Sequence, residues 1–134
     1  MLDPITIKLA QGVNYAALTT LFPNGSPQTQ LMWVDSDKEF LYINTEIHRE
    51  KYKNVDKDSR ISILIWKNDD PFKYVEVRGN VVDSFGGQDA RNHIDKLSEK
   101  YFNKPYPFIV QTERVVLKIK ATKEVFFNVK KEDF

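Results

Sequence analysis

The chain has 134 residues, of which 41% are hydrophobic and 29% are charged, a balance that indicates one globular domain and excludes a largely disordered chain. A net charge of +1 gives no general field for gripping nucleic acid, and the absence of cysteine excludes disulfides, thiolate catalysis and cysteine-ligated metals. No apolar run is long enough for a membrane helix, and no secretory signal is visible. We therefore expect a single cytoplasmic domain over residues 1–134.

The first third of the chain predicts a short helix and then three strands. Asp3–Gly12 offers an N-cap aspartate, a proline at the first helical position and a glycine at the exit. Residues 15–22 are β-rich, and Asn24-Gly25 is a strong turn signal before a second strand at 27–34. A third strand is expected at 40–44, so the three strands should form an antiparallel meander.

The middle of the chain changes character twice. Residues 46–58 are dense in charge and predict a loop with a short helix. Residues 60–66 are apolar enough to predict a strand buried on both faces. Residues 74–81 alternate between apolar and polar, and Gly79 within them indicates a bulge or a close backbone approach.

The last third predicts one long helix and two final strands. Apolar residues recur at helical spacing over residues 88–102. Two β-like stretches follow, at 114–120 and 124–129. Six or seven strands with one good late helix predict a mainly β fold, a closed or partly closed antiparallel barrel with a few short helices.

The most informative segment is Asn44–Asn54, between the end of a strand and the start of a helix. Arg49, Lys51 and Lys53 cluster at the start of the helix, where Glu50 is the only acidic residue among them. Backbone N–H groups at a helix N-terminus favour an anion, and an arginine can offer a phosphate two parallel donors. The segment therefore predicts an anion site.

Two neutral side chains in this segment, Thr45 and Asn54, can add hydrogen bonds to an anion. The alternative is a solvated, charged helix face, because runs of charge usually lie at the surface.

Aromatic residues form a second candidate cluster, made of Trp33, Trp66, Phe72 and Tyr74. Flat rings could sandwich a planar ligand. The alternative is that each ring belongs to the core or to a dimer interface.

Acid–base and metal sites have little support in this sequence. The two histidines, His48 and His93, are far apart, so a histidine-rich metal site is not expected. No serine has a histidine that the sequence can pair with it, and no phosphate-binding glycine-rich loop is present. An anion cradle with flat apolar walls instead suits a cofactor that brings its own reactivity.

Five stretches, in the same order, resemble the motifs of the pyridoxamine-phosphate-oxidase-like split-barrel flavoproteins. They are the hairpin Leu18–Gln28, Trp33, the set Asn44-Thr45 with Arg49, Lys51 and Asn54, the stretch Asp58–Ser62, and the stretch Asp69–Gly79. The branch that the chain resembles most uses the deazaflavin coenzyme F-420, whereas the general family uses FMN. One departure is Gln30–Trp33, where the family usually has S-P-V-W.

The resemblance implies a six-stranded split β-barrel of Greek-key type that forms a homodimer with two sites at the interface. It implies an oxidoreductase that transfers a hydride between coenzyme F-420 and a small organic substrate. The alternatives are an FMN-dependent oxidoreductase and a non-catalytic flavin or deazaflavin carrier. An oligonucleotide-binding barrel is disfavoured by the neutral charge.

The resemblance also implies roles for eleven residues in holding the cofactor. The phosphate or acidic tail would be held by Arg49, Lys51 and Asn54. The ribityl chain and ring edge would lie along Asn44 and Thr45, and the ring along Met32 and Trp33. The site would be closed, in part from the partner subunit, by Ile65, Trp66, Phe72 and Lys73.

Overall fold

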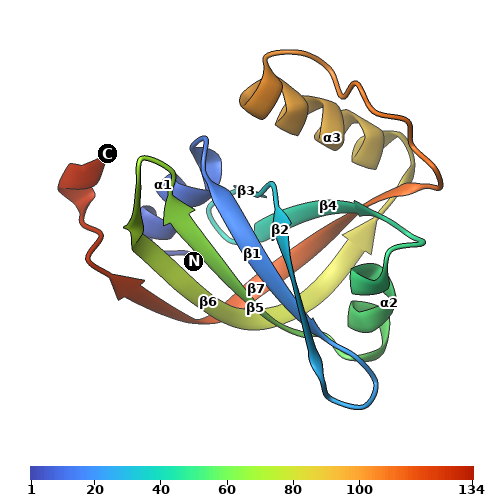
Figure 1. Cartoon of the computed structure of the whole chain (residues 1–134), viewed down its shortest axis with the longest axis horizontal. Helices are drawn as coiled ribbons and strands as arrows, with labels where there is room; N and C mark the ends of the chain where they lie inside the picture. The colour runs from blue at the N-terminus through green and yellow to red at the C-terminus, as the bar shows by residue number, and fades with distance from the viewer.

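The computed structural model describes all 134 residues, and its fold is mainly β, as the sequence predicts. Seven antiparallel strands form one sheet in the order β2-β1-β5-β6-β7-β4-β3, which curls into a half-barrel (Figure 1). The strands are β1 (Tyr15–Leu21), β2 (Pro27–Met32), β3 (Asp35–Ser36), β4 (Leu41–Glu46), β5 (Arg60–Lys67), β6 (Asp70–Phe85) and β7 (Arg114–Phe127). The helices are α1 (Pro4–Gln11), α2 (Glu50–Lys57), α3 (Gly87–Phe102) and a final 3₁₀ turn, Lys131–Asp133. The seven strands agree with the six or seven that the sequence pattern predicts and are one more than the six that the resemblance implies, because the two-residue β3 adds an edge to the sheet.

The hairpin between β1 and β2 is formed by the turn that Asn24-Gly25 predicts. Gly25 has a φ of +86°, a conformation that side chains with a Cβ rarely adopt. The Asn24 side chain accepts a hydrogen bond from the Ser26 backbone N–H at 3.0 Å. This local chemistry fixes the register, which ends with Leu21 opposite Pro27.

The predicted meander of three strands is wrong, because β4 does not pair with β2. Instead β4 pairs with β7, from Leu41 opposite Ile119 to Glu46 opposite Arg114. The free edge of β1 is taken by β5, with Ala16 opposite Ile65. Composition identifies the strands, but the partner of β4 lies far along the chain, where no local signal points to it.

The two longest strands, β6 and β7, carry the curl of the sheet. Residues 114–120 and 124–129 were expected to be separate strands, but one continuous strand covers most of both ranges. The pairing shifts register between Arg78 and Gly79, which bends the ladder without ending it. A Cβ on Gly79 would lie 2.1 Å from the carbonyl oxygen of Lys120, so the predicted close backbone approach is confirmed.

The core lies inside the curl of the sheet. Ile61, Ile63 and Ile65 of β5 point inward and are buried, whereas Ser62 and Leu64 between them are half-buried on the outer face. The strand therefore alternates, and the expectation that it is buried on both faces is wrong for a single chain.

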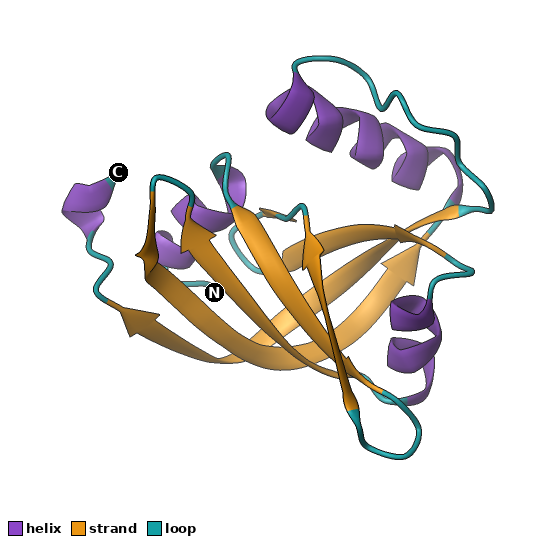
Figure 2. Ribbon diagram, in the orientation of Figure 1, coloured by secondary structure: helices purple, strands orange, loops and turns teal.

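Three helices flank the sheet rather than covering one face (Figure 2). In α1 the Asp3 side chain accepts a hydrogen bond from the Ile5 N–H at 2.8 Å, which confirms the predicted N-cap. In α3 the buried residues are Ala90, Ile94, Leu97 and Ser98, on the side that packs against β7 and β4. None of the helices combines the length and the apolar character that crossing a membrane requires.

Candidate functional site

A cleft of about 330 Å³ opens where the end of β2, the end of β4 and the start of α2 meet α3 and the loop that follows it. It is lined by twelve residues: Gln30, Leu31, Met32, Trp33, Asn44, Thr45, Arg49, Lys51, Ile94, Tyr106, Phe108 and Arg114. Six of the eleven residues named from the sequence are among them: Met32, Trp33, Asn44, Thr45, Arg49 and Lys51.

The corner between β4 and α2 positions the polar side of the cleft. Asn44 and Thr45 stand near the end of β4, where pairing with β7 fixes their backbone. Arg49 is the N-cap residue of α2, and no side chain caps the helix, so its first N–H groups have no side-chain acceptor. Lys51 follows in the first turn and is only 6% exposed. The charged segment is therefore more than a solvated helix face.

Three cationic side chains, Arg49, Lys51 and Arg114, line this cleft, and the two arginines pair with one carboxylate. Glu46 lies 3.5 Å from Arg114 and 3.9 Å from Arg49, measured between side-chain oxygen and nitrogen. Burial, and then the charges of Arg49 and Arg114, lower the pKa of Lys51 to about 8. The cleft therefore has an excess of positive charge, and a bound anion would relieve the repulsion among the cations.

Glu46 is an ionised carboxylate that pairs with Arg49 and Arg114. Burial alone would raise the pKa of Glu46, but backbone hydrogen bonds from Thr112 and Gln111 and the charge of Arg114 outweigh it and lower the pKa. The Thr112 N–H donates to Oε1 at 2.8 Å. The carboxylate is thus ionised at neutral pH and stabilises its neighbours, rather than serving as an acid.

Arg114 is the best-anchored cation of the three. Its Nε donates to Asn44 Oδ1 at 2.9 Å, and its guanidinium lies 5.2 Å from the ring centroid of Tyr106. The side chain is 8% exposed. Because these contacts fix the guanidinium before any ligand arrives, little conformational entropy is lost when an anion binds.

Aromatic rings form the other wall of the cleft. Trp33 stacks on Tyr101 with ring centroids 4.9 Å apart and an angle of 7° between the planes. Tyr106 meets Trp33 edge-on at 6.2 Å, and Phe108 meets Tyr106 edge-on at 5.4 Å. One flank of the cleft is thus cationic and the other is flat and apolar.

Five residues named from the sequence lie outside this cleft. Asn54 is 1% exposed and donates to Thr20 Oγ1 at 3.0 Å, which ties α2 to β1. Ile65 belongs to the core. The remaining three, Trp66, Phe72 and Lys73, are at the hairpin between β5 and β6, which Figure 1 shows at the opposite end of the molecule from α2 and α3.

The predicted aromatic cluster is therefore divided. Trp33 packs against Tyr101 of α3 and against Tyr106 in the loop that follows it. Tyr74 instead stacks on Phe127, with ring centroids 5.2 Å apart. Phe72 is 75% exposed, and the Lys73 ammonium pairs with Asp133 at 2.5 Å. Within one chain these residues do not close the cleft.

Sequence reasoning missed half of the cleft: Gln30, Leu31, Ile94, Tyr106, Phe108 and Arg114. Arg114 was taken only as the start of a strand, because the strand pairing that brings it beside Glu46 is long-range. Tyr106 and Phe108 flank Pro107 in a loop, and paired aromatics in a proline-containing loop were an available signal.

Comparison with known proteins gives one family match and several solved structures with the same fold. The sequence pattern of the pyridoxamine 5'-phosphate oxidase family matches residues 7–127. A solved structure described as an F420 reductase is 27% identical, with a TM-score of 0.80, over 93% of this chain and 98% of that one.

Two further solved structures share the fold. The conserved hypothetical protein Rv2991 from Mycobacterium tuberculosis is 18% identical, with a TM-score of 0.72, over 100% of this chain and 89% of that one. General Stress Protein 26 from Bacillus anthracis str. Sterne is 19% identical, with a TM-score of 0.66, over 94% and 92%. No curated protein sequence matches the chain.

Proposed function

Because this chain belongs to the pyridoxamine 5'-phosphate oxidase family, we propose that it is an oxidoreductase that holds a flavin or deazaflavin cofactor in the cleft between β4, α2 and α3. The proposed reaction is hydride transfer between the cofactor and a small organic substrate. The observation that carries the proposal is the pairing of a cationic flank with an aromatic flank in one cleft.

The donor set of the cleft fits such a cofactor. Arg49, Lys51 and Arg114 offer charge-assisted donors to a phosphate or acidic tail, and only Glu46 competes with an anion for them. Trp33, Tyr106 and Phe108 supply apolar ring surface in the same cleft, against which a fused ring can pack. A ligand that is anionic at one end and planar at the other matches both flanks.

The chain itself would bind, orient and shield the reactants. When bound, a flavin or deazaflavin supplies the hydride chemistry. Asn44 and Thr45 are buried between the cationic and aromatic flanks, where they can fix the ligand that spans them. No carboxylate or imidazole lines the cleft, and we assign no side chain as acid or base; a proton would come from solvent or from another group at the site.

We propose coenzyme F-420 as the cofactor, with FMN as the alternative. The support is the 27% identity to a protein described as an F420 reductase, over nearly the full length of both chains. The test is titration of the purified protein with each cofactor, followed by fluorescence and absorbance. Saturable binding is expected. No saturation with either cofactor up to about 100 μM, a weak-affinity regime, would contradict the proposal.

We also propose that the protein is a homodimer whose interface completes the site. The cleft, at about 330 Å³, is at the lower end of the range of about 300–1,000 Å³ for ligand pockets. Exposed apolar side chains also mark the sheet, among them Leu31, Phe72 and Phe127. Light scattering coupled to size-exclusion chromatography should give twice the mass of one chain. A monomeric mass at every concentration would contradict this.

A cofactor carrier is the second candidate, since the cleft is lined by binding groups and has no acid–base pair. The two candidates differ in turnover. A reductase should oxidise reduced F-420 faster than the free solution reaction when a suitable acceptor is present. A carrier should bind the coenzyme and leave that rate unchanged with every acceptor.

A further inference from the structure

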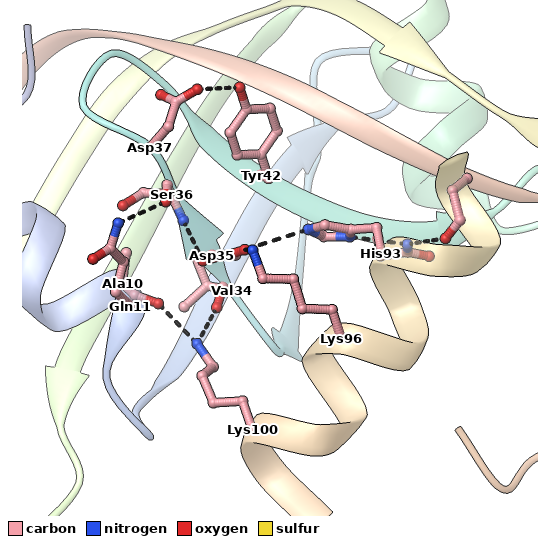
Figure 3. A network of polar contacts seen from close by, with 12 residues as sticks. Ala10, Gln11, Val34, Asp35, Ser36, Asp37, Tyr42, His93, Lys96 and Lys100 are labelled. Carbon is pink, nitrogen blue, oxygen red and sulfur yellow. Dashed lines mark hydrogen bonds and ion pairs between the residues drawn. The ribbon is translucent and has the colours of Figure 1, made fainter. Parts of the chain in front are cut away.

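His93, on α3, does not line the cleft, yet it contacts a residue that does. Its Nδ1 lies 3.1 Å from Nδ2 of Asn44. On its other side, Nε2 lies 3.6 Å from Asp35 Oδ2, and no partner is closer. Figure 3 shows the imidazole pointing from α3 toward Asp35 on the short strand β3.

The orientation of the Asn44 amide follows from its other partners. Nδ2 also lies 2.9 Å from the carbonyl oxygen of Ala90, which can only accept a hydrogen bond. Oδ1 lies 2.9 Å from Nε of Arg114, which can only donate. The NH₂ group therefore faces α3, and the carbonyl faces the cleft cation.

This orientation fixes the tautomer of His93. Because Nδ2 of Asn44 is a donor, Nδ1 of His93 must accept, and the ring proton must be on Nε2. A neutral imidazole that accepts a hydrogen bond at Nδ1 carries its proton on Nε2. In His93 that nitrogen is on the side of the Asp35 carboxylate.

Asp35 is itself held in place. Burial would raise the pKa of Asp35, but the neighbouring His93 imidazole, a hydrogen bond from the Ser36 backbone N–H at 2.8 Å, and the charges of Lys100 and Lys96 outweigh it and lower the pKa. Lys100 also donates to the carbonyl oxygens of Val34, at 2.6 Å, and Ala10, at 2.9 Å, and so fixes the backbone beside Asp35 (Figure 3).

We propose that His93 is a positioning residue for the anion site. It accepts the second N–H of the buried Asn44 amide and thereby holds Asn44 Oδ1 against Arg114. Without this acceptor, a buried N–H would lack a partner, and the amide would turn toward water. The guanidinium would then lose the contact that aims it. This inference rests on the proposed function, because the arginine that His93 helps to orient belongs to the proposed anion site.

Three variants separate an acceptor role from simple packing. His93→Leu keeps much of the bulk and removes the acceptor. His93→Asn places a carbonyl oxygen near the position of Nδ1 and should rescue. Asn92→Leu introduces the same leucine at the neighbouring, exposed position of α3 and serves as the control.

The first readout is the side-chain ¹H–¹⁵N signal of Arg114 Nε in the ligand-free protein. We expect a slowly exchanging signal in the unmodified protein, in His93→Asn and in Asn92→Leu, and its loss in His93→Leu. An unchanged signal in His93→Leu, or its equal loss in His93→Asn, would overturn the proposal. If His93→Leu does not fold, the ring ¹⁵N chemical shifts of His93 in the unmodified protein test the proposal instead. A proton on Nε2 is expected, and a proton on Nδ1 would overturn the proposal.

The second readout is affinity for FMN and for inorganic phosphate. His93→Leu should weaken both about tenfold, and His93→Asn should restore most of the loss. Equal affinity in His93→Leu and the unmodified protein would overturn the proposal. If the unmodified protein binds neither probe nor F-420, the proposed function fails, while the Arg114 signal still decides the role of His93.

Discussion

Asn44 and Arg114 lie 70 positions apart in the chain, yet the Arg114 Nε donates a 2.9 Å hydrogen bond to Asn44 Oδ1. The contact joins β4 to β7, the strand pair that no local sequence signal identifies. The proposed anion site therefore depends on assembly of the whole sheet, and its Asn44–Arg114 contact is present in the ligand-free protein.

Replacing Arg114 should weaken anion binding strongly. In Arg114→Met, the lost charge-assisted hydrogen bonds correspond to about 1.5–3 kcal/mol, or at least about tenfold in affinity for FMN or F-420. Arg91→Met is the control, since Arg91 pairs with Asp95 on the flank of α3, away from the cleft lining. Fluorescence titration measures the affinity of both variants, and equal affinities in Arg114→Met and Arg91→Met would show that Arg114 does not bind the cofactor.

The charged segment of α2 should divide into residues that bind and residues that do not. Arg49→Ala and Lys51→Ala should each weaken cofactor binding about tenfold, because both side chains line the cleft. Lys53→Ala should leave binding unchanged, because Lys53 is exposed and does not line it. A loss of similar size in all three variants would indicate a diffuse charge effect rather than a built site.

The local features of this fold could be predicted from the sequence, and the long-range ones could not. Asp3 and Gly25 act through neighbours within a few residues, so the first helix and the first hairpin were predicted correctly. The predicted meander was wrong because β4 pairs with β7 and not with β2, and this pairing depends on how the whole sheet packs.

The site shows the same division. Arg49 and Lys51 were found because they are close together in the chain, and Arg114 was missed because only the fold brings it to them. Asn54 was assigned to the phosphate by its place in a motif, but its amide is turned to Thr20 inside the molecule. A motif gives the residue type and spacing, not the direction of the side chain.

Anion affinity should fall as the pH rises through about 8, the value to which burial and the neighbouring arginines lower the pKa of Lys51. A lysine carries its charge below its pKa, so the Lys51 contribution is present at pH 7 and is lost in more alkaline solution. Binding of the anion raises that pKa, so the affinity should start to fall near the pKa of the ligand-free protein and continue to fall up to the higher pKa of the complex. Titrations between pH 6.5 and 9.5 (roughly 1.5 units either side of that value) should show the fall.

Lys51→Met is the control for that pH dependence, because it removes the titrating group. Its affinity should be lower at pH 7 and nearly flat across the range. If the variant shows the same alkaline fall as the unmodified protein, another group is responsible.

Asn54→Ala should reduce stability rather than cofactor affinity. The change leaves the buried Thr20 hydroxyl without its partner, which costs about 1–3 kcal/mol in the free energy of unfolding. Urea denaturation measures that cost, and titration of the folded variant should give the affinity of the unmodified protein. A variant with unchanged stability and weakened binding would contradict this and would indicate that Asn54 binds the phosphate.

Gly79→Ala should destabilise the sheet, since the new Cβ would lie 2.1 Å from the carbonyl oxygen of Lys120. Moving β6 away from β7 to accommodate it should cost about 1–3 kcal/mol or more. Gly86→Ala is the matched control, with its closest contact at an ordinary 3.5 Å. Thermal unfolding of the two variants should separate them clearly, and equal midpoints would contradict the close approach.

The most direct test of the cofactor site is a crystal structure of the protein grown with F-420 or FMN. The proposal predicts the phosphate within hydrogen-bond distance of Arg49, Lys51 or Arg114, and the ring system toward Trp33. A phosphate bound elsewhere, with the cleft between β4 and α3 filled only by water, would contradict it.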